Sequence, residues 1–200
     1  MKRAILFAFF AYLGSIIYSQ DLVSKNVMIG VFTNVGFNQP VRFASFDDDR
    51  SYHGRGSYTL GVKFSRFLSQ SNKIEVGACY SVHKLAINFL LDPSPPDRLP
   101  TETFETFNIP IILKHYLKSN YSLSIGTVID IGLPRNSLFT DTQTGFGLSI
   151  GGCRDFTISN FILDITPNLE IHSVIPFSSV SGQQRLMVLG LRIGLNNNCP

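Results

Sequence analysis

The sequence lacks tryptophan and is poor in charged side chains. Asp, Glu, Lys and Arg make up only 16% of its 200 residues. That share is low for a surface that faces water throughout, because charged side chains normally gather there. Phenylalanine, by contrast, occurs 17 times. The length corresponds to one domain, and the composition argues against an ordinary water-soluble surface for it.

The charged residues that are present nearly balance one another. The chain has 17 basic and 14 acidic residues. Removing Lys2 and Arg3 with the leader described below leaves 15 basic against 14 acidic residues, a net charge of +1. Binding to nucleic acid or to an acidic lipid surface requires a clustered excess of positive charge. Nucleic acid is therefore not an expected partner.

Only the beginning of the chain carries a long apolar run. Ala4–Ile17 is almost wholly apolar, Lys2 and Arg3 precede it, and small or polar residues up to Gln20 follow it. This pattern predicts a secretory signal peptide over residues 1–20, cleaved close to Gln20. The alternative is a membrane-anchoring helix, but such a helix needs about 20 apolar residues.

Residues 21–200 contain no apolar run that approaches the length of a spanning helix. A chain without such a run crosses a membrane only as a closed barrel. Instead, this part of the chain has eight stretches in which apolar residues alternate with small or polar ones, the pattern of β-strands. The stretches are approximately Asn26–Gly36, Ser57–Leu68, Lys73–Ala86, Glu102–Leu117, Tyr121–Gly132, Thr144–Phe156, Phe161–Ser173 and Gln184–Leu195.

The junctions between these stretches alternate between long and short. The long ones are Phe37–Arg55, Leu91–Thr101, Pro134–Thr142 and Val174–Gly182. The short ones are Ser69–Asn72, Lys118–Asn120 and Thr157–Asn160. Short turns at one rim and long loops at the other are typical of outer-membrane barrels. The sequence thus predicts an all-β fold, an eight-stranded antiparallel up-and-down transmembrane β-barrel, in the bacterial outer membrane with both ends on the periplasmic side.

Alternation alone does not say which face of the strands lies inside. An apolar face turned inward would make a soluble periplasmic carrier of the lipocalin kind, and one turned outward makes a membrane barrel. The predicted strands are often about ten to thirteen residues long, and a tilted membrane strand needs about 9–11. The second face consists mostly of Gly, Ser, Thr and Asn. We therefore expect the apolar face to meet lipid.

With this orientation, several charged side chains point into the lumen. An eight-stranded barrel has room inside only for its own side chains, and unpaired buried charges are costly. We therefore expect a closed salt-bridge network and no conducting pore. Its expected members are Lys63, Lys114, Arg192, Glu75, Asp130, Asp164 and Glu170, with His83 and His172 as further candidates.

Two prolines lie within the strand patterns. Pro110 and Pro167 each remove a backbone donor from the ladder, so we expect a local β-bulge at both positions.

A catalytic interpretation rests on the loop end of the seventh stretch. Glu170, His172 and Ser173 are close in sequence, and the following loop holds Ser178, Ser179 and Ser181. A Ser/His/Glu set there would suit an outer-leaflet enzyme that modifies lipid A. Glu170 and His172, however, share the inward face, which favours a satisfied lumen pair. We expect no catalytic residues.

The possible metal ligands and loop segments give no definite site. His53, His83 and His115 lack metal-ligand spacing, and no cofactor is expected. Three adjacent carboxylates, Asp47–Asp49, are suited to calcium by their oxygen ligands, but the alternating ligand spacing is missing and a solvated loop is the expected role. The stiff segment Pro93–Asp97 is a rigid loop or a partner-binding surface.

The three cysteines match no zinc motif. Cys79 could pair with Cys153, or Cys153 with Cys199, and free buried thiols are the third possibility.

The segment Phe107–Leu117, which reads Phe-Asn-Ile-Pro-Ile-Ile-Leu-Lys-His-Tyr-Leu, resembles a strand of the PorT-like outer-membrane β-barrel family. In that family such a strand precedes a tight periplasmic turn and then a glycine-containing strand, here Leu123–Ile129. The first strand, with Ile29–Val31, is similar too. The resemblance implies an integral barrel without catalytic residues, sometimes an accessory of protein secretion. The implied partners are outer-membrane lipid, lipopolysaccharide and envelope or secretion proteins met through the long outer loops.

Overall fold

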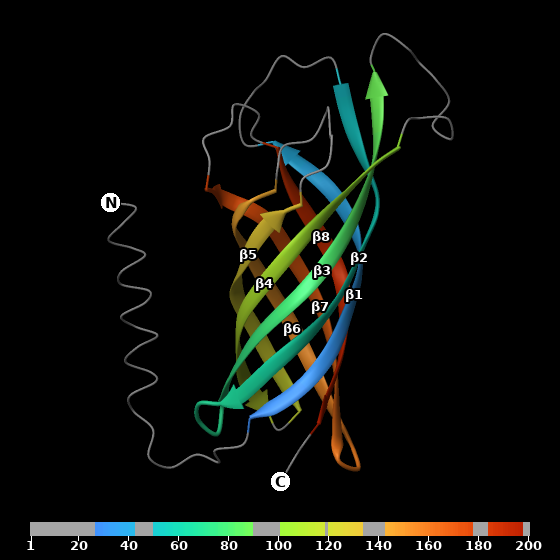
Figure 1. Ribbon diagram of the computed structural model, residues 1–200. Coiled ribbons are helices and arrows are strands. Elements are labelled where there is room, and N and C mark those ends of the chain that lie inside the picture. The colour runs from blue at the N-terminus through green and yellow to red at the C-terminus, as the bar shows by residue number, and fades with distance from the viewer. Residues whose placement is uncertain are drawn as a thin grey trace.

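The computed structural model is a closed β-barrel of eight antiparallel strands (Figure 1). It describes residues 27–42, 50–89, 101–118, 120–133, 143–177 and 184–197. The strands are β1 (Met28–Arg42), β2 (Arg50–Phe67), β3 (Asn72–Phe89), β4 (Thr101–Lys118), β5 (Tyr121–Gly132), β6 (Gly145–Ile158), β7 (Phe161–Pro176) and β8 (Gln184–Asn197). Each strand pairs with the next, and β8 pairs with β1. The predicted fold class is confirmed.

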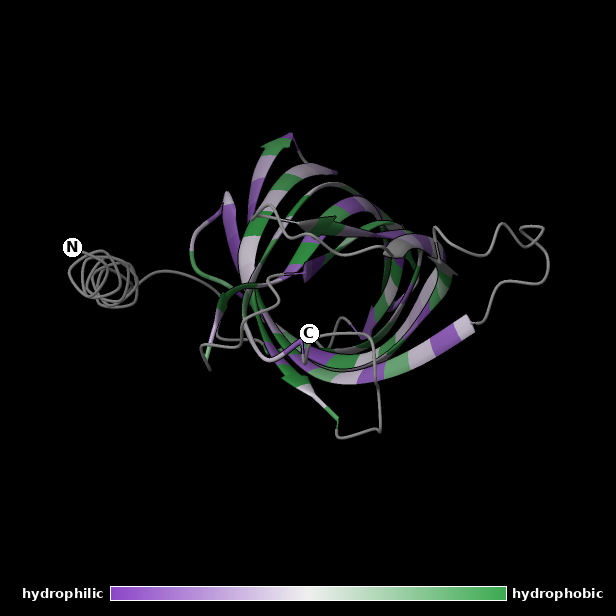
Figure 2. Ribbon diagram, turned by 90° about the horizontal axis from the view of Figure 1, so that it is seen from above, coloured by the Kyte–Doolittle hydropathy of each residue, from purple (hydrophilic) through white to green (hydrophobic). Residues whose placement is uncertain are grey.

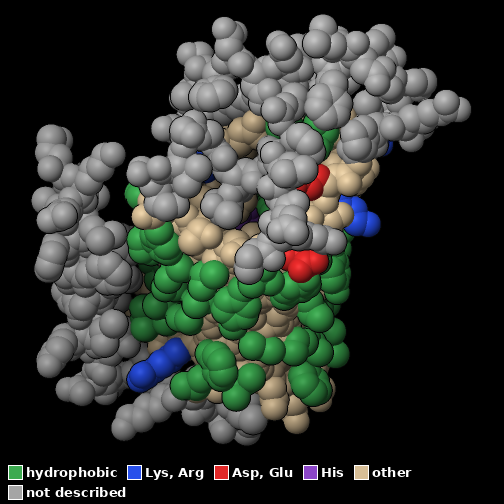
Figure 3. Space-filling view, turned by 45° about the horizontal axis from the view of Figure 1, so that its top comes forward, with side chains coloured by type: hydrophobic (Ala, Val, Ile, Leu, Met, Phe, Trp, Pro, Cys, Tyr) green, Lys and Arg blue, Asp and Glu red, His purple; other side chains and the backbone are tan. Residues whose placement is uncertain are grey.

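The apolar face of the strands lies on the outside of the barrel. Along β8, Leu189 is 63% exposed and Leu191 is 43% exposed, whereas Arg192 is only 4% exposed. Figure 2 shows the same alternation of hydrophobic and hydrophilic residues along the strands of the barrel, and Figure 3 shows apolar side chains covering the middle of the visible surface. The soluble carrier, which requires an apolar interior, is therefore wrong for this fold.

The strand bounds lie within two residues of the predicted ones at the short-turn rim, and the largest differences are at the loop ends of β1 and β2. β5 has the predicted bounds, but β1 continues to Arg42 and β2 already begins at Arg50. The predicted loop Phe37–Arg55 is thus partly strand. Here β2 stays paired with β3 up to Arg50 opposite Phe89. The paired strands therefore extend beyond the exposed apolar residues that surround the middle of the barrel.

Several predicted features fall on residues outside the described ranges. They are the signal peptide at 1–20, the carboxylates Asp47–Asp49, the segment Pro93–Asp97, the serines Ser178, Ser179 and Ser181, and Cys199. These remain predictions. Among the described residues, no helix is long and apolar enough to cross a membrane.

The predicted β-bulges at Pro110 and Pro167 are wrong. The pairs Val76–Ile111 and Cys79–Asn108 keep one register across Pro110. The pairs to either side of Pro167 also keep theirs. A strand residue directs its N–H to one neighbouring strand only, so a proline interrupts one ladder and leaves the other intact. In both cases the continuing register places a glycine opposite the proline, Gly77 opposite Pro110 and Gly152 opposite Pro167.

Irregularities in the ladder occur elsewhere, at Gly54/Gly56, at Tyr116/Lys118 and at Phe146/Leu148. The first of these bends β2 at the loop rim, where Gly56 has a φ of 120°. A positive φ of this size is readily adopted only by glycine.

The two rims of the barrel differ in the length of their connections. In Figure 1, β1 begins and β8 ends at the same lower rim, where the tight turns also lie. The hairpin of β6 and β7 reaches furthest beyond this rim. This arrangement agrees with the predicted orientation, in which the lower rim is periplasmic.

Candidate functional site

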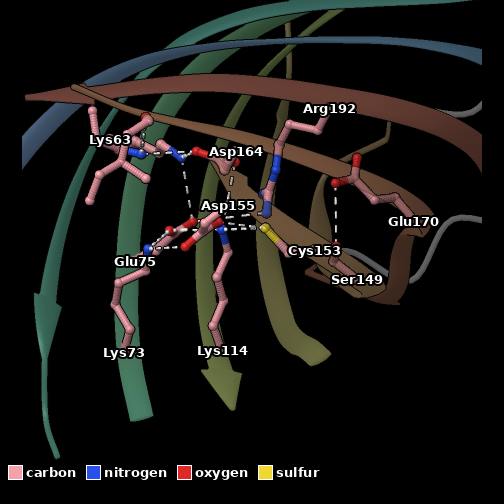
Figure 4. A network of polar contacts seen from close by, with 12 residues as sticks. Lys63, Lys73, Glu75, Lys114, Ser149, Cys153, Asp155, Asp164, Glu170 and Arg192 are labelled. Atoms are coloured by element: carbon pink, nitrogen blue, oxygen red, sulfur yellow. Dashed lines mark hydrogen bonds and ion pairs between the residues drawn. The ribbon is translucent and has the colours of Figure 1, made fainter. Parts of the chain in front are cut away.

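The half of the lumen near the short turns holds a buried group of charged side chains, which we call the ionic cluster. It consists of Lys63, Lys73, Lys114, Arg192, Glu75, Asp155 and Asp164. These residues come from β2, β3, β4, β6, β7 and β8, and their charged ends converge across the barrel (Figure 4). Alternation along each strand places them inward, as predicted for most of them.

Glu75 is the centre of the ionic cluster. Its carboxylate lies 3.0 Å from Nζ of Lys114, 3.3 Å from Nζ of Lys73 and 3.8 Å from Nζ of Lys63. Arg192 approaches to 3.9 Å. The side chain of Glu75 is only 3% exposed. Since an isolated carboxylate in such a place would be strongly destabilised, the four cations account for its burial.

The other two carboxylates of the cluster connect to it through shared lysines. Asp164 pairs with Lys63 and lies 3.6 Å from Nζ of Lys114. It also accepts a hydrogen bond of 2.9 Å from the side-chain amide of Asn196. Asp155 lies 3.8 Å from Nζ of Lys73 and accepts a hydrogen bond of 2.6 Å from the hydroxyl of Tyr116. The cluster is therefore continuous from β2 to β7.

Three members of this region were not predicted: Lys73, Asp155 and Tyr116. The alternation nevertheless indicated them, because residues two positions apart on a strand share a face. Each lies two positions from an inward-facing residue: Lys73 from Glu75, Asp155 from Cys153, and Tyr116 from Lys114. Lying near strand ends, they are the positions at which alternation is hardest to extend from sequence.

Asp130 and Glu170, predicted as members of one network, belong to a second group nearer the loop rim. We call this group the histidine cluster: Ser57, His83, Asp130, Glu170 and His172. Nδ1 of His172 lies 2.8 Å from the carboxylate of Asp130. Its Nε2 lies 4.0 Å from that of Glu170. The His83 ring meets the His172 ring edge-on at 5.3 Å between centroids. The predicted single network is thus divided into two.

The predicted pairing of Ser173 with His172 is not formed, although the histidine cluster contains a buried serine–histidine pair, with Oγ of Ser57 2.9 Å from Nδ1 of His83. His172 directs Nδ1 to Asp130, and the other carboxylate near it is Glu170. The hydroxyl of Ser173 is buried and has no hydrogen-bond partner among the described residues, although its backbone N–H donates to Asp130 at 2.7 Å. Catalysis by Ser173 would require its hydroxyl to meet the histidine.

Uncharged side chains occupy the rest of the lumen. Between the two clusters, the hydroxyls of Thr59 and Ser81 lie 2.8 Å apart, and Asn108 donates to Ser81 at 3.1 Å. Towards the loop rim, a small apolar core closes the interior: Leu85, Phe104, Leu186 and Val188. The inward face was predicted to be mostly small and polar, and this apolar core was not predicted.

A small cavity lies between these side chains in the described part of the barrel. An internal cavity of about 10 Å³ is bordered by Phe32, Asn34, Asn108, Glu170 and Arg192, among others. A single water needs roughly 10–15 Å³. In this part of the lumen, side chains therefore fill the interior, as expected for eight strands.

Both described cysteines, Cys79 and Cys153, are buried inward-facing free thiols. Of the predicted possibilities, the Cys79–Cys153 pairing is therefore not formed. The thiol of Cys153 lies 3.4 Å from Nζ of Lys114 and donates to Asp155 at 3.1 Å.

The remaining histidines lie apart from one another. His53 and His115 are exposed, and His115 bonds the side chain of Asn72 at 2.9 Å. Within the described ranges, no group of three or more potential ligands could hold a metal ion.

Comparison with known proteins supports the fold at low sequence identity. No protein-family model matches the chain. No curated protein matches it either. The outer membrane protein OprG from Pseudomonas aeruginosa is similar, with a TM-score of 0.52 and 11% identity over 86% of this chain and 95% of that chain. Ail of Yersinia pestis, solved with the heparin analogue sucrose octasulfate, gives a TM-score of 0.44 and 11% identity over 86% and 99%.

The fold is thus that of bacterial outer-membrane β-barrels. The closed eight-stranded barrel and its outward apolar belt agree with the predicted outer-membrane location, because such a belt is stable only in contact with lipid.

Proposed function

We propose that this chain is a non-catalytic, non-conducting barrel that anchors an interaction surface in the outer membrane. The observation that carries the proposal is the ionic cluster, which joins side chains of six strands across the lumen. A closed set of ion pairs blocks the path that a solute would take. What remains for function is the surface that the barrel presents outside.

A sheet extension at the loop rim supplies part of that surface. β2 and β3 stay paired up to Arg50 opposite Phe89, and β3 and β4 up to Ala86 opposite Thr101. His53, Arg55 and Lys84 are exposed there. Basic side chains just beyond the apolar belt suit the phosphate groups of lipopolysaccharide, and a rigid sheet suits an envelope protein partner.

We further propose a relationship to the PorT-like family and, with it, an accessory role in protein secretion. Phe107–Leu117 lies in β4, which leads through a tight turn into β5 with Gly126. This order of strand, turn and glycine-containing strand supports the resemblance.

Two measurements test the proposed role. The purified protein should give no steady current in planar bilayers, whereas a stable single-channel current would contradict a closed lumen. In intact cells, a photo-crosslinking amino acid at His53 should capture lipopolysaccharide or an envelope protein. The matched control is the same amino acid at Ile125, which is on the lipid-facing belt and should capture neither.

A further inference from the structure

Arg154 is a charged side chain on the lipid-facing side of the barrel near the periplasmic rim. It lies on β6 opposite Tyr121, the first residue of β5. Its guanidinium carbon is 5.1 Å from the ring centroid of Tyr121 and 4.7 Å from that of Phe156. No described carboxylate forms an ion pair with it. A lipid-facing arginine is far less costly near the membrane interface, where lipid phosphates lie, than at the bilayer midplane.

The surface next to Arg154 is open on the membrane side. A Cβ atom built on the exposed Gly152 meets no atom within 4 Å. Leu123 on β5 lies opposite this glycine, and the register of β6 and β7 places Pro167 opposite it on the other side. Leu123 is 56% exposed, so the open space has apolar walls.

The order of these features along β6 matches the order of groups in a lipid molecule. From the loop rim towards the periplasm, β6 presents Ile150, then Gly152, then Arg154 and finally Phe156. An inner-leaflet phospholipid has its acyl chains towards the bilayer centre and its phosphate towards the periplasm. A second exposed cation, Lys118, lies opposite Tyr121 on the neighbouring strand.

We infer that this face binds one phospholipid of the inner leaflet, with its phosphodiester on Arg154 and one acyl chain over Gly152. Two aromatic rings hold the guanidinium by cation–π contact, which leaves its N–H groups to donate charge-assisted hydrogen bonds to phosphate oxygens. The inference rests on the membrane location of the barrel and is independent of the proposed outer surface.

The test is native mass spectrometry of the full-length mature barrel in detergent micelles titrated with phosphatidylglycerol. The wild-type barrel should retain one lipid. Arg154→Gln should weaken its binding about tenfold, the effect of losing one charge-assisted hydrogen-bonding group. Arg66→Gln, which removes another exposed cation at the same rim, is the matched control and should leave binding unchanged.

A second variant tests the acyl part of the site. Gly152→Val places a branched side chain in the open space, where the Cβ atom meets nothing within 4 Å. It should weaken lipid binding, while unboiled and boiled samples should still differ in gel mobility, as expected of a closed barrel. Soluble glycerol phosphate should not displace the lipid, which distinguishes a lipid site from a free-phosphate site. Equal binding by wild type and Arg154→Gln, an equal loss in Arg66→Gln, or displacement by glycerol phosphate would each overturn the inference.

Discussion

At the scale of single residues, the balance of charge in the lumen determines how much each side chain matters. The ionic cluster contains four cations and three carboxylates. Glu75 lies within 4 Å of all four cations. Losing this carboxylate therefore increases the excess of positive charge, whereas losing one lysine reduces it.

Glu75→Gln should be among the most destabilising conservative changes in the barrel. It retains the shape of the side chain but leaves four buried cations against two carboxylates. Breaking buried pairs in this way costs about 3–5 kcal/mol. Urea unfolding in lipid vesicles measures the effect, followed by circular dichroism because the chain has no tryptophan. An unchanged free energy of unfolding would show that Glu75 is not the centre of the cluster.

Lys114→Met should also destabilise the barrel, but by less. Glu75 keeps Lys73 at 3.3 Å, and three cations remain for three carboxylates. The expected loss is about 1–3 kcal/mol, that of a buried hydrogen-bonding group. Lys118→Met is the matched control, since Lys118 is exposed on the same strand. Its urea midpoint of unfolding should equal that of the wild-type barrel. A larger loss in Lys114→Met than in Glu75→Gln would contradict the charge balance.

At the scale of strands, the loop rim depends on a close approach between β1 and β2. A Cβ atom on Gly54 would lie 1.3 Å from the carbonyl oxygen of Asn38. The side chain of Asn38 is buried, accepts a hydrogen bond from the N–H of Gly56 at 2.8 Å, and donates one to the carbonyl of Lys84 at 3.1 Å. It thereby bridges the irregular register of β2 and β3.

Gly54→Ala should therefore destabilise the barrel through its backbone. The added methyl group forces β1 and β2 apart and separates Asn38 from its partners, at an expected cost of about 1–3 kcal/mol. Gly152→Ala is the matched control, because its Cβ meets nothing within 4 Å. Thermal unfolding in detergent, read by the mobility shift on a gel, compares the two. Equal melting temperatures would show that the close approach is absent.

At the scale of the whole molecule, the outer surface is matched to a bilayer, so the effect of a new charge should depend on depth. Ile125 and Leu117 are equally exposed, at 62% and 61%. Ile125 lies in mid-barrel between Leu113 and Ile150, whereas Leu117 lies beside a short turn.

Ile125→Arg should cost about 2–4 kcal/mol and Leu117→Arg about 0–1 kcal/mol, the values for the midplane and the interface. Urea unfolding in phospholipid vesicles gives both. Equal costs would mean that the belt does not face lipid at these depths.

The eight strands, their direction and the outward apolar face were determined by the sequence alone. Alternation with a period of two is a local property of the chain, and it placed Ile125 and Lys114 on opposite faces without knowledge of any neighbour. The length of the strands and the small, polar second face then assigned Ile125 outward and Lys114 inward. The sequence also indicated which rim has the short turns. The β-bulges predicted at Pro110 and Pro167 were wrong for the same reason. A local pattern does not show which neighbouring strand the missing N–H of each proline would have faced.

Only the tertiary structure decided which inward side chains meet. Glu75 and Asp164 are 89 positions apart and share Lys63 and Lys114 because the tilt and register of six strands bring them to one depth. Asp130, equally inward, lies too near the loop rim and pairs with His172 instead. Parity along a strand determines the side on which a residue lies, but depth in a barrel depends on closure, which is a property of all eight strands together.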